Sequence, residues 1–151
     1  MQEIPESGTV LYDCALDIDR IMEFGIDLEA VLDGNDLPPE GVRIDVFVSG
    51  QLVGGLLHGQ MTAVDYLYIR PDGKISMHVH GDIETHDGAR LSLFVEGVLT
   101  RRSDGPNLDL RETVGLFTSD ARYQWVNSLQ IWGHGIADMV NQKVIVQTRV
   151  A

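Results

Sequence analysis

The sequence predicts an all-β protein, an antiparallel lipocalin-like β-barrel of about eight to nine strands. Three observations support this fold class. Short runs of apolar and β-branched residues follow one another from Gly41 onward, turn signals separate them about every ten residues, and no long helical pattern lies between them. A parallel α/β sheet would need a helix after each strand, so that class is disfavoured.

The expected strands and turns are assigned in chain order. The strands are 42–49, 52–60, 63–70, 75–85, 90–99, 114–118, 123–132 and 143–150. The expected turns are Gly50-Gln51, Pro71-Asp72-Gly73 and His86-Asp87-Gly88, because Pro presets φ and Gly accepts a positive φ. Residues 101–106 are expected to form a polar loop, and the glycines within 52–60 are expected to let that strand bend.

The first 40 residues differ from the rest of the chain. Residues 10–16 are expected to form a strand, and apolar residues recur at helical spacing over 19–32, which predicts one amphipathic helix. Gly34 stands where a helix C-terminal cap belongs. The whole chain, 1–151, is expected to be a single domain, with segment 1–40 packed on the barrel.

Composition narrows the range of partners. The chain carries 11 basic and 23 acidic residues, a formal net charge of −12, and eleven of the acids lie within the first 40 residues. A basic surface is needed to bind nucleic acid or an anionic membrane, so neither partner is expected. Cys14 is the only cysteine, which excludes an internal disulfide. The acidic N-terminus lacks the features of a signal peptide, so we expect a cytoplasmic protein.

Several segments resemble a known family. They are Gly41-Val42-Arg43, the glycines 50, 54 and 59, Ala63-Val64-Asp65-Tyr66, Asp72-Gly73, Thr85-His86-Asp87-Gly88-Ala89, Gly97, the run 117–127 with Arg122-Tyr123-x-Trp125-x-Asn127, and Gly133-His134-Gly135. Over residues 41–150 the chain resembles the bacterial domain-of-unknown-function family 3237, which consists of small lipocalin-like β-barrel proteins. The resemblance implies a closed barrel with a small-molecule cavity and no settled reaction. The chain departs from the family in its long acidic N-terminus and in His80, where the family tends to carry arginine.

The expected strand 75–85 has one polar and one apolar face. Alternation places His78, His80, Glu84 and their neighbours at even positions on the polar face. That face lies either toward solvent or toward a wet barrel lumen. In the lumen, His78-x-His80-x-x-x-Glu84 would resemble the first metal motif of cupins. The second cupin motif needs Pro-x-Gly before another histidine, and His134 has no such proline, so no metal is expected.

A second candidate chemistry is proton transfer. Asp65 lies between apolar residues in an expected strand, and burial would raise its pKa toward neutrality. We therefore expect Asp65 and His80 to form a proton-transfer pair with His78 as a second polarising group. The alternative is a structural Asp65 that caps a turn or pairs with Arg43.

A third feature is the aromatic pattern Tyr123-x-Trp125-x-Asn127. In a strand these three side chains would share one face and line a ligand pocket, together with Arg43 and Glu84. The alternative for the aromatic residues is core packing.

These patterns together predict a protein that binds a small hydrophobic organic molecule in the lumen. We expect cofactor-independent acid–base chemistry of the isomerase, cyclase, hydratase or lyase type. The alternatives are a carrier without turnover and a cupin-like metal enzyme that uses His78, His80 and Glu84. A homodimer is expected by analogy with other lipocalin-like barrels.

Overall fold

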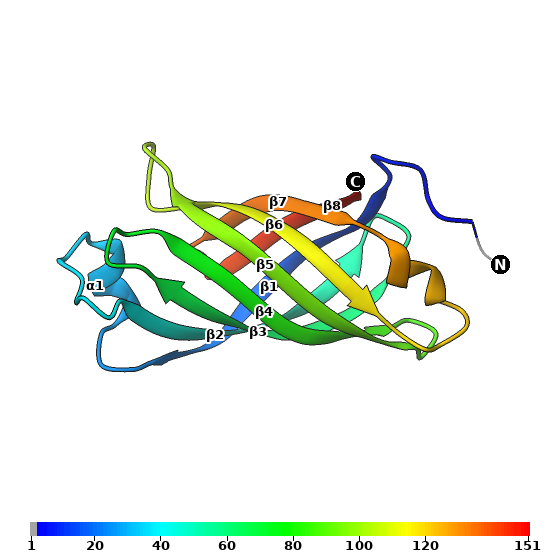
Figure 1. Ribbon diagram of the computed structural model, residues 1–151, viewed down its shortest axis with the longest axis horizontal. Coiled ribbons are helices and arrows are strands. Elements are labelled where there is room, and N and C mark those ends of the chain that lie inside the picture. Colours follow the sequence, from blue (N-terminus) through cyan, green and yellow to red (C-terminus); the bar gives the residue numbers. More distant parts are fainter. Residues whose placement is uncertain (1–2) are drawn as a thin grey trace.

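The computed structural model describes residues 3–151 (Figure 1). Eight strands carry most of the chain, and one short α-helix and one 3-10 helix join them. The elements are β1 (Val10–Glu23), α1 (Leu28–Leu32), β2 (Val42–Val53), β3 (Gly59–Ile69), β4 (Ile75–Thr85), β5 (Arg90–Arg101), β6 (Leu108–Phe117), η1 (Gln124–Ser128), β7 (Ile131–Asp138) and β8 (Lys143–Val150).

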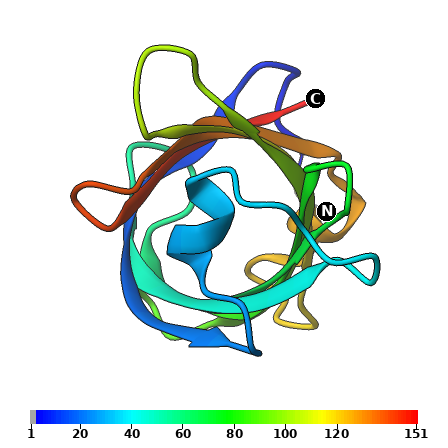
Figure 2. The ribbon, with the colours of Figure 1, turned by 90° about the vertical axis from the view of Figure 1, so that its left-hand side faces the viewer.

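The strands form a closed barrel, which confirms the predicted fold class. Each strand pairs antiparallel with the next, and β8 pairs with β1, so the sheet has no free edge (Figure 2). Side chains alternate between the lumen and the outer face along each strand, as β6 shows with buried Leu108, Leu110, Val114 and Leu116. The hydrophobic core is therefore the interior of the barrel.

The predicted helix over 19–32 is mostly wrong. Strand β1 continues to Glu23 because residues up to this point pair with β2, ending at Glu23↔Ile44, with a register shift between Ile18 and Arg20. The chain turns at Gly25, which has a φ of +108°. Only Leu28–Leu32 is helical, and the Asp27 side chain caps it by accepting a hydrogen bond from the Ala30 amide at 2.8 Å.

Further boundaries differ from the predictions: the strand expected over 52–60 is replaced by the end of β2 and the start of β3, and the strand expected over 114–118 is β6, which begins at Leu108. The turn expected at Gly50-Gln51 is absent because both residues pair with β3, and β2 ends at Val53 instead. The strand expected over 123–132 is replaced by η1 and the start of β7. Successive hydrogen bonds, from the Tyr123 amide to Asp120 and from the Val126 amide to Tyr123, wind this segment into tight turns. The turns expected at 71–73 and 86–88 do join β3 to β4 and β4 to β5.

Helix α1 lies across one end of the barrel (Figure 2). Val31 is fully buried, and Leu28 reaches the space inside the barrel. The Arg101 guanidinium, at the end of β5, donates hydrogen bonds to the carbonyl oxygens of Val31 and Leu32, the latter at 2.6 Å. The C-terminal end of α1 is thus tied to the barrel wall. Within residues 3–151, neither helix has the length and hydropathy needed to cross a bilayer.

Candidate functional site

The barrel encloses a mainly apolar cavity beneath α1. The water-accessible volume of this cavity is about 80 Å³, and the empty space around it, open solvent included, is about 830 Å³. All eight strands and α1 contribute lining residues, and most of these are aliphatic side chains or methionines. The lining carries two carboxyl groups, Asp65 and Glu112, and no lysine, arginine or histidine. A closed apolar cavity with a few polar groups is typical of a small-molecule site.

Asp65 projects into the cavity from β3. Its neighbours at the same face are Ala63 and Leu67, and Asp65 itself is only 8% exposed. One carboxylate oxygen accepts a hydrogen bond of 3.1 Å from the backbone amide of His78 on β4. Burial raises the pKa of Asp65 to about 7, against the lowering effect of the His78 amide and with a smaller raising effect from Asp45.

The Asp65 carboxyl replaces a backbone hydrogen bond between β3 and β4. The pairing of β3 with β4 runs to Asp65↔Val79, is then interrupted, and resumes at Tyr68↔Ser76. The His78 amide lies in this interruption and donates to the side chain of Asp65. The backbone therefore holds the carboxyl in a fixed position on the wall.

Glu112 is the second lumenal acid and comes from β6. It occupies an inward position between Leu110 and Val114, and its partners across the two neighbouring strands are Gly97 and Gly133. No group within residues 3–151 donates a hydrogen bond to its carboxyl, and the side chain is half-buried. Burial raises the pKa of Glu112 to about 7, and the negative charge of Asp65 adds to this rise.

Tyr12 and Cys14 on β1 complete the ionisable groups of the lining. Register pairs run from Glu112 through Gly133 and Thr148 to Tyr12, so these residues lie on one row of the wall. Burial is the main cause that raises the pKa of Tyr12 well above its usual value and that of Cys14 to about 12. Both groups are therefore protonated at neutral pH, and the thiol is a poor nucleophile.

The two carboxyls differ in their surroundings, which separates their roles. The amide of His78 stabilises the anion of Asp65, whereas Glu112 has no donor and gains from staying protonated. Both pKa values lie near 7, so near neutral pH one carboxyl of the pair can be ionised while the other keeps its proton. A base and an acid that face one apolar cavity can take a proton from a bound molecule and return one to it.

The predicted histidines lie outside the cavity. Val79 and Met77 take the inward positions of β4, so alternation turns His78 and His80 to the outer face. There the His80 ring packs edge-on against Phe94, with ring centroids 5.0 Å apart. The structure therefore does not bring His80 to Asp65, as the proton-transfer pair required, because the two side chains lie on opposite sides of the wall.

Arg43 and Glu84 also lie on the outer face. Arg43 donates to the Leu67 carbonyl at 3.1 Å and to Asp45 at 3.2 Å, so it does not pair with Asp65. Glu84 pairs with Arg90 at 3.2 Å. Among residues 3–151 there is no group of three His, Cys, Asp or Glu side chains placed to hold a metal ion, and this includes the cupin-like set on β4.

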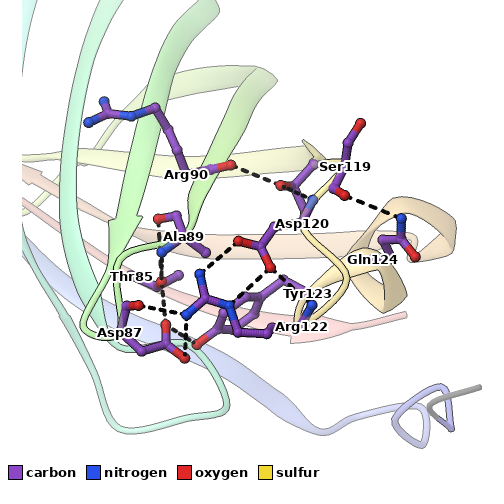
Figure 3. Close-up of polar contacts among 10 residues, drawn as sticks. Thr85, Asp87, Ala89, Arg90, Ser119, Asp120, Arg122, Tyr123 and Gln124 are labelled. Atoms are coloured by element: carbon purple, nitrogen blue, oxygen red, sulfur yellow. Dashed lines mark hydrogen bonds and ion pairs between the residues drawn. The ribbon is translucent and has the colours of Figure 1, made fainter.

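The segment 123–128, which carries the Tyr123-x-Trp125-x-Asn127 pattern, lies at the end of the barrel remote from α1 (Figure 1). The Tyr123 hydroxyl donates to Asp87 at 2.8 Å, and Arg122 bonds the Asp87 carbonyl, which ties this segment to the β4–β5 turn (Figure 3). Asn127 binds both backbone polar groups of Thr118 at 2.8 Å. Trp125 is half-buried and packs on the core from outside. None of the three lines the cavity, because the segment is a 3-10 helix and not a strand.

Glu112 is the site residue that sequence reasoning missed. The expected strand began at Val114, two residues too late to include it. A signal was present, since Leu108, Leu110, Glu112, Val114 and Leu116 alternate with polar residues and place one acid on an otherwise apolar face. Asp65 stands in a similar apolar series, Ala63, Asp65, Leu67 and Ile69, although its prediction rested on the residues directly beside it in the expected strand.

Known structures share this fold at low sequence identity. A beta-barrel-like protein from Acinetobacter baumannii AYE has 18% identity and a TM-score of 0.77, with 99% of each chain covered. A protein of unknown function from Clostridium acetobutylicum has 17% identity and a TM-score of 0.78, covering 97% of this chain and 99% of its own. An enzyme from Penicillium herquei has 15% identity and a TM-score of 0.63 over the whole of both chains.

These similarities establish the fold alone. No family model and no curated protein sequence matches the chain. The function is therefore argued from the cavity and its side chains.

Proposed function

We propose that this protein binds a small hydrophobic organic molecule in the barrel lumen and catalyses cofactor-independent proton transfer on it. The observation that carries the proposal is the placement of Asp65 and Glu112 in one apolar cavity with no basic side chain in the lining. A buried carboxyl is destabilising unless it is partnered. Asp65 is buried, Glu112 is half-buried, and both line one apolar space, which is better explained by chemistry on a ligand than by packing.

Each carboxyl has its own role in the proposed reaction. The Asp65 carboxylate, held by the His78 amide, takes a proton from a C–H or O–H group of the ligand. Glu112, as the carboxylic acid, gives its proton to an acceptor atom elsewhere on the ligand. One proton leaves the ligand and one arrives, so the product is an isomer or a cyclised form, and exchange with water resets the pair.

The same cavity without turnover would make the protein a carrier, and two experiments distinguish these functions. The first locates the ligand with ¹³C-labelled methionine methyl groups. Met61, Met77 and Met139 line the cavity, whereas Met22 is exposed outside it. A ligand in the lumen should shift the first three signals and leave that of Met22 unchanged. If Met22 alone responds, the site is on the surface and the proposal is wrong.

The second experiment tests proton transfer on any ligand found in this way. In D₂O the protein should catalyse exchange of an acidic C–H of that ligand, followed by proton NMR. Asp65→Asn and Glu112→Gln should each slow exchange by about two to four orders of magnitude, the usual worth of general acid–base catalysis. Retained binding with no exchange in any form, including the native protein, would identify a carrier.

Two expectations from the sequence stay predictions. Membership of family 3237 rests on the residues that resemble it, and the homodimer rests on analogy. Tyr123 and Asn127 belong to the most specific part of that resemblance. They form hydrogen bonds with Asp87 and Thr118 and do not line the cavity.

A further inference from the structure

We infer that the lumen selects its ligand by charge: it takes a hydrophobic amine as the ammonium ion and rejects a carboxylate of the same shape. This inference deepens the proposed function and depends on it, because it names the chemical class that the lumenal site accepts. Three observations support it: the sign of the groups in the lining, the unpartnered acid, and the charge around the covered end of the barrel.

The lining contains acidic groups and no basic group that could compensate their negative charge. Asp65 and Glu112 are its only carboxyl groups, and it contains no lysine, arginine or histidine. Tyr12 and Cys14, the other ionisable groups that face the cavity, are neutral at physiological pH. Behind the wall, Asp45 adds a further negative charge that acts on Asp65. An anionic ligand would be repelled by each of these acids in its ionised form, with no cation in the lining to offset the repulsion.

Glu112 provides the point of attachment. No group within residues 3–151 donates a hydrogen bond to its carboxyl, and the side chain lines the cavity and lies over Gly133. The Asp65 carboxyl has one donor, the His78 amide, and capacity for more. An ammonium group can donate charge-assisted hydrogen bonds to the ionised carboxyl of the pair, and the other carboxyl keeps its proton.

The covered end of the barrel favours a cation on its way in. Glu23, Asp27, Glu29 and Asp33 lie at or beside α1, and the Asp27 and Glu23 side chains are fixed by hydrogen bonds to the first turn of this helix. The chain as a whole carries a formal net charge of −12. A field of this sign raises the local concentration of cations and lowers that of anions.

The inference predicts a distinctive pH dependence. Without ligand, protons neutralise the two acids, whose pKa values lie near 7. An ammonium ion must compete with these protons, so its affinity should rise as the pH increases from 5.5 to 8. The affinity of an uncharged ligand that accepts a hydrogen bond from protonated Glu112 should instead fall as the pH increases from 5.5 to 8.

The test compares probes of one shape and three charges. The first set is benzylamine, benzyl alcohol and benzoate, and the second is hexylamine, hexanol and hexanoate. Dissociation constants are measured by titration of the methionine methyl signals at several pH values. We expect the amine of each set to bind at least tenfold more tightly than the alcohol at pH 7.5, and the carboxylate to bind at least tenfold more weakly than the alcohol.

Variants assign the preference to the two acids. Glu112→Gln and Asp65→Asn should each reduce the preference for amine over alcohol by at least tenfold. Glu96→Gln is the matched control. Glu96 faces outward from β5, so this substitution removes the same charge from the surface and not from the lumen. Equal binding of amine and alcohol, or binding of a carboxylate, would overturn this inference alone. If none of the six probes moves Met61, Met77 or Met139, the proposed function fails with it.

Discussion

The carboxyl oxygen Oε1 of Glu112 lies 2.8 Å from the point that a β-carbon on Gly133 would occupy. Real β-carbons essentially never come this close to another heavy atom, so the absence of a side chain at Gly133 allows Glu112 to lie against the wall of the lumen. The two residues are register partners on β6 and β7. Gly97 on β5 is the register partner of Glu112 on its other side, and it too has no side chain beside Glu112.

This relationship makes Gly133→Ala a specific probe of the lumenal acid. The new methyl group would lie 2.8 Å from both Cγ and Oε1 of Glu112, so this side chain would have to rotate about its Cα–Cβ bond. We expect the free energy of unfolding to change by less than about 1 kcal/mol, and the affinity for a lumenal ligand to fall several-fold. Thermal unfolding and methionine-methyl titration measure the two effects.

Gly115→Ala is the control for this variant. Gly115 is exposed on the same strand as Glu112, and its nearest contact would be a carbonyl oxygen at 3.7 Å. This change should alter neither stability nor binding. Equal binding by the two variants would contradict the role assigned to the position of Glu112.

The raised pKa values predict how stability changes with pH. Asp65 and Glu112 have ordinary pKa values of 3.8 and 4.5 and values of about 7 in the folded protein. Between these limits the folded state keeps protons that the unfolded state has lost, so stability is greatest at low pH in this window and falls as the pH rises to 8. For the pair, the loss between pH 4.5 and 8 should be on the order of 6 kcal/mol.

Chemical denaturation at pH 4.5, 6 and 8 checks this prediction. The double variant Asp65→Asn/Glu112→Gln should remove most of the slope. Asp120, whose pKa is lowered to about 2 mainly by its hydrogen bond to the Arg122 side chain, gives the opposite slope only below pH 4. A native protein whose stability rises from pH 4.5 to 8 would show that the two acids are not buried as described.

The contact of Arg101 with α1 predicts control of access to the lumen. Arg101→Ala removes the hydrogen bonds to the Val31 and Leu32 carbonyls and should weaken the attachment of α1 by about 1–3 kcal/mol. The amides of Asp33 and Gly34, which bond within this turn, should then exchange with solvent faster. Ligand association should also become faster.

Arg70→Ala is the comparison for Arg101. Arg70 pairs with Asp72 in an exposed turn between β3 and β4, so its loss removes a guanidinium without touching α1. Unchanged exchange at Asp33 and Gly34 in Arg101→Ala would show that this side chain does not hold the helix.

The outward position of His80 gives a prediction opposite to that from the sequence. His80→Gln should leave the affinity and pH dependence of a lumenal ligand unchanged, because the ring packs against Phe94 and Tyr66 outside the barrel. A hundredfold fall in the exchange rate of this variant in the D₂O assay would show that His80 takes part in proton transfer.

Local patterns predicted the barrel but not the orientation of every strand. Alternation in 75–85 separated two faces, and only closure of the sheet decides which face is inside. Asp65 was identified because an acid among apolar neighbours is visible within one strand. Its partner Glu112 is distant in the sequence and meets it only through barrel closure.

The errors in the site have a physical cause as well. Tyr123, Trp125 and Asn127 have strand-forming neighbours, but hydrogen bonds to Asp87 and Thr118 wind the segment into a 3-10 helix. In the same way, pairing with β2 extends β1 through residues that have helical spacing. Tertiary contacts override local preference in both places.

The most direct test of the central claim is titration of the side-chain carboxyl carbons of Asp65 and Glu112 by ¹³C NMR. The signals are assigned by comparison with Asp65→Asn and Glu112→Gln. The account predicts that the pair titrates with apparent pKa values near 7, and that an amine probe in the lumen lowers both. Titration of both carboxyls below pH 5 in the free protein would contradict it, because the lumen would then hold two ordinary ionised acids at neutral pH.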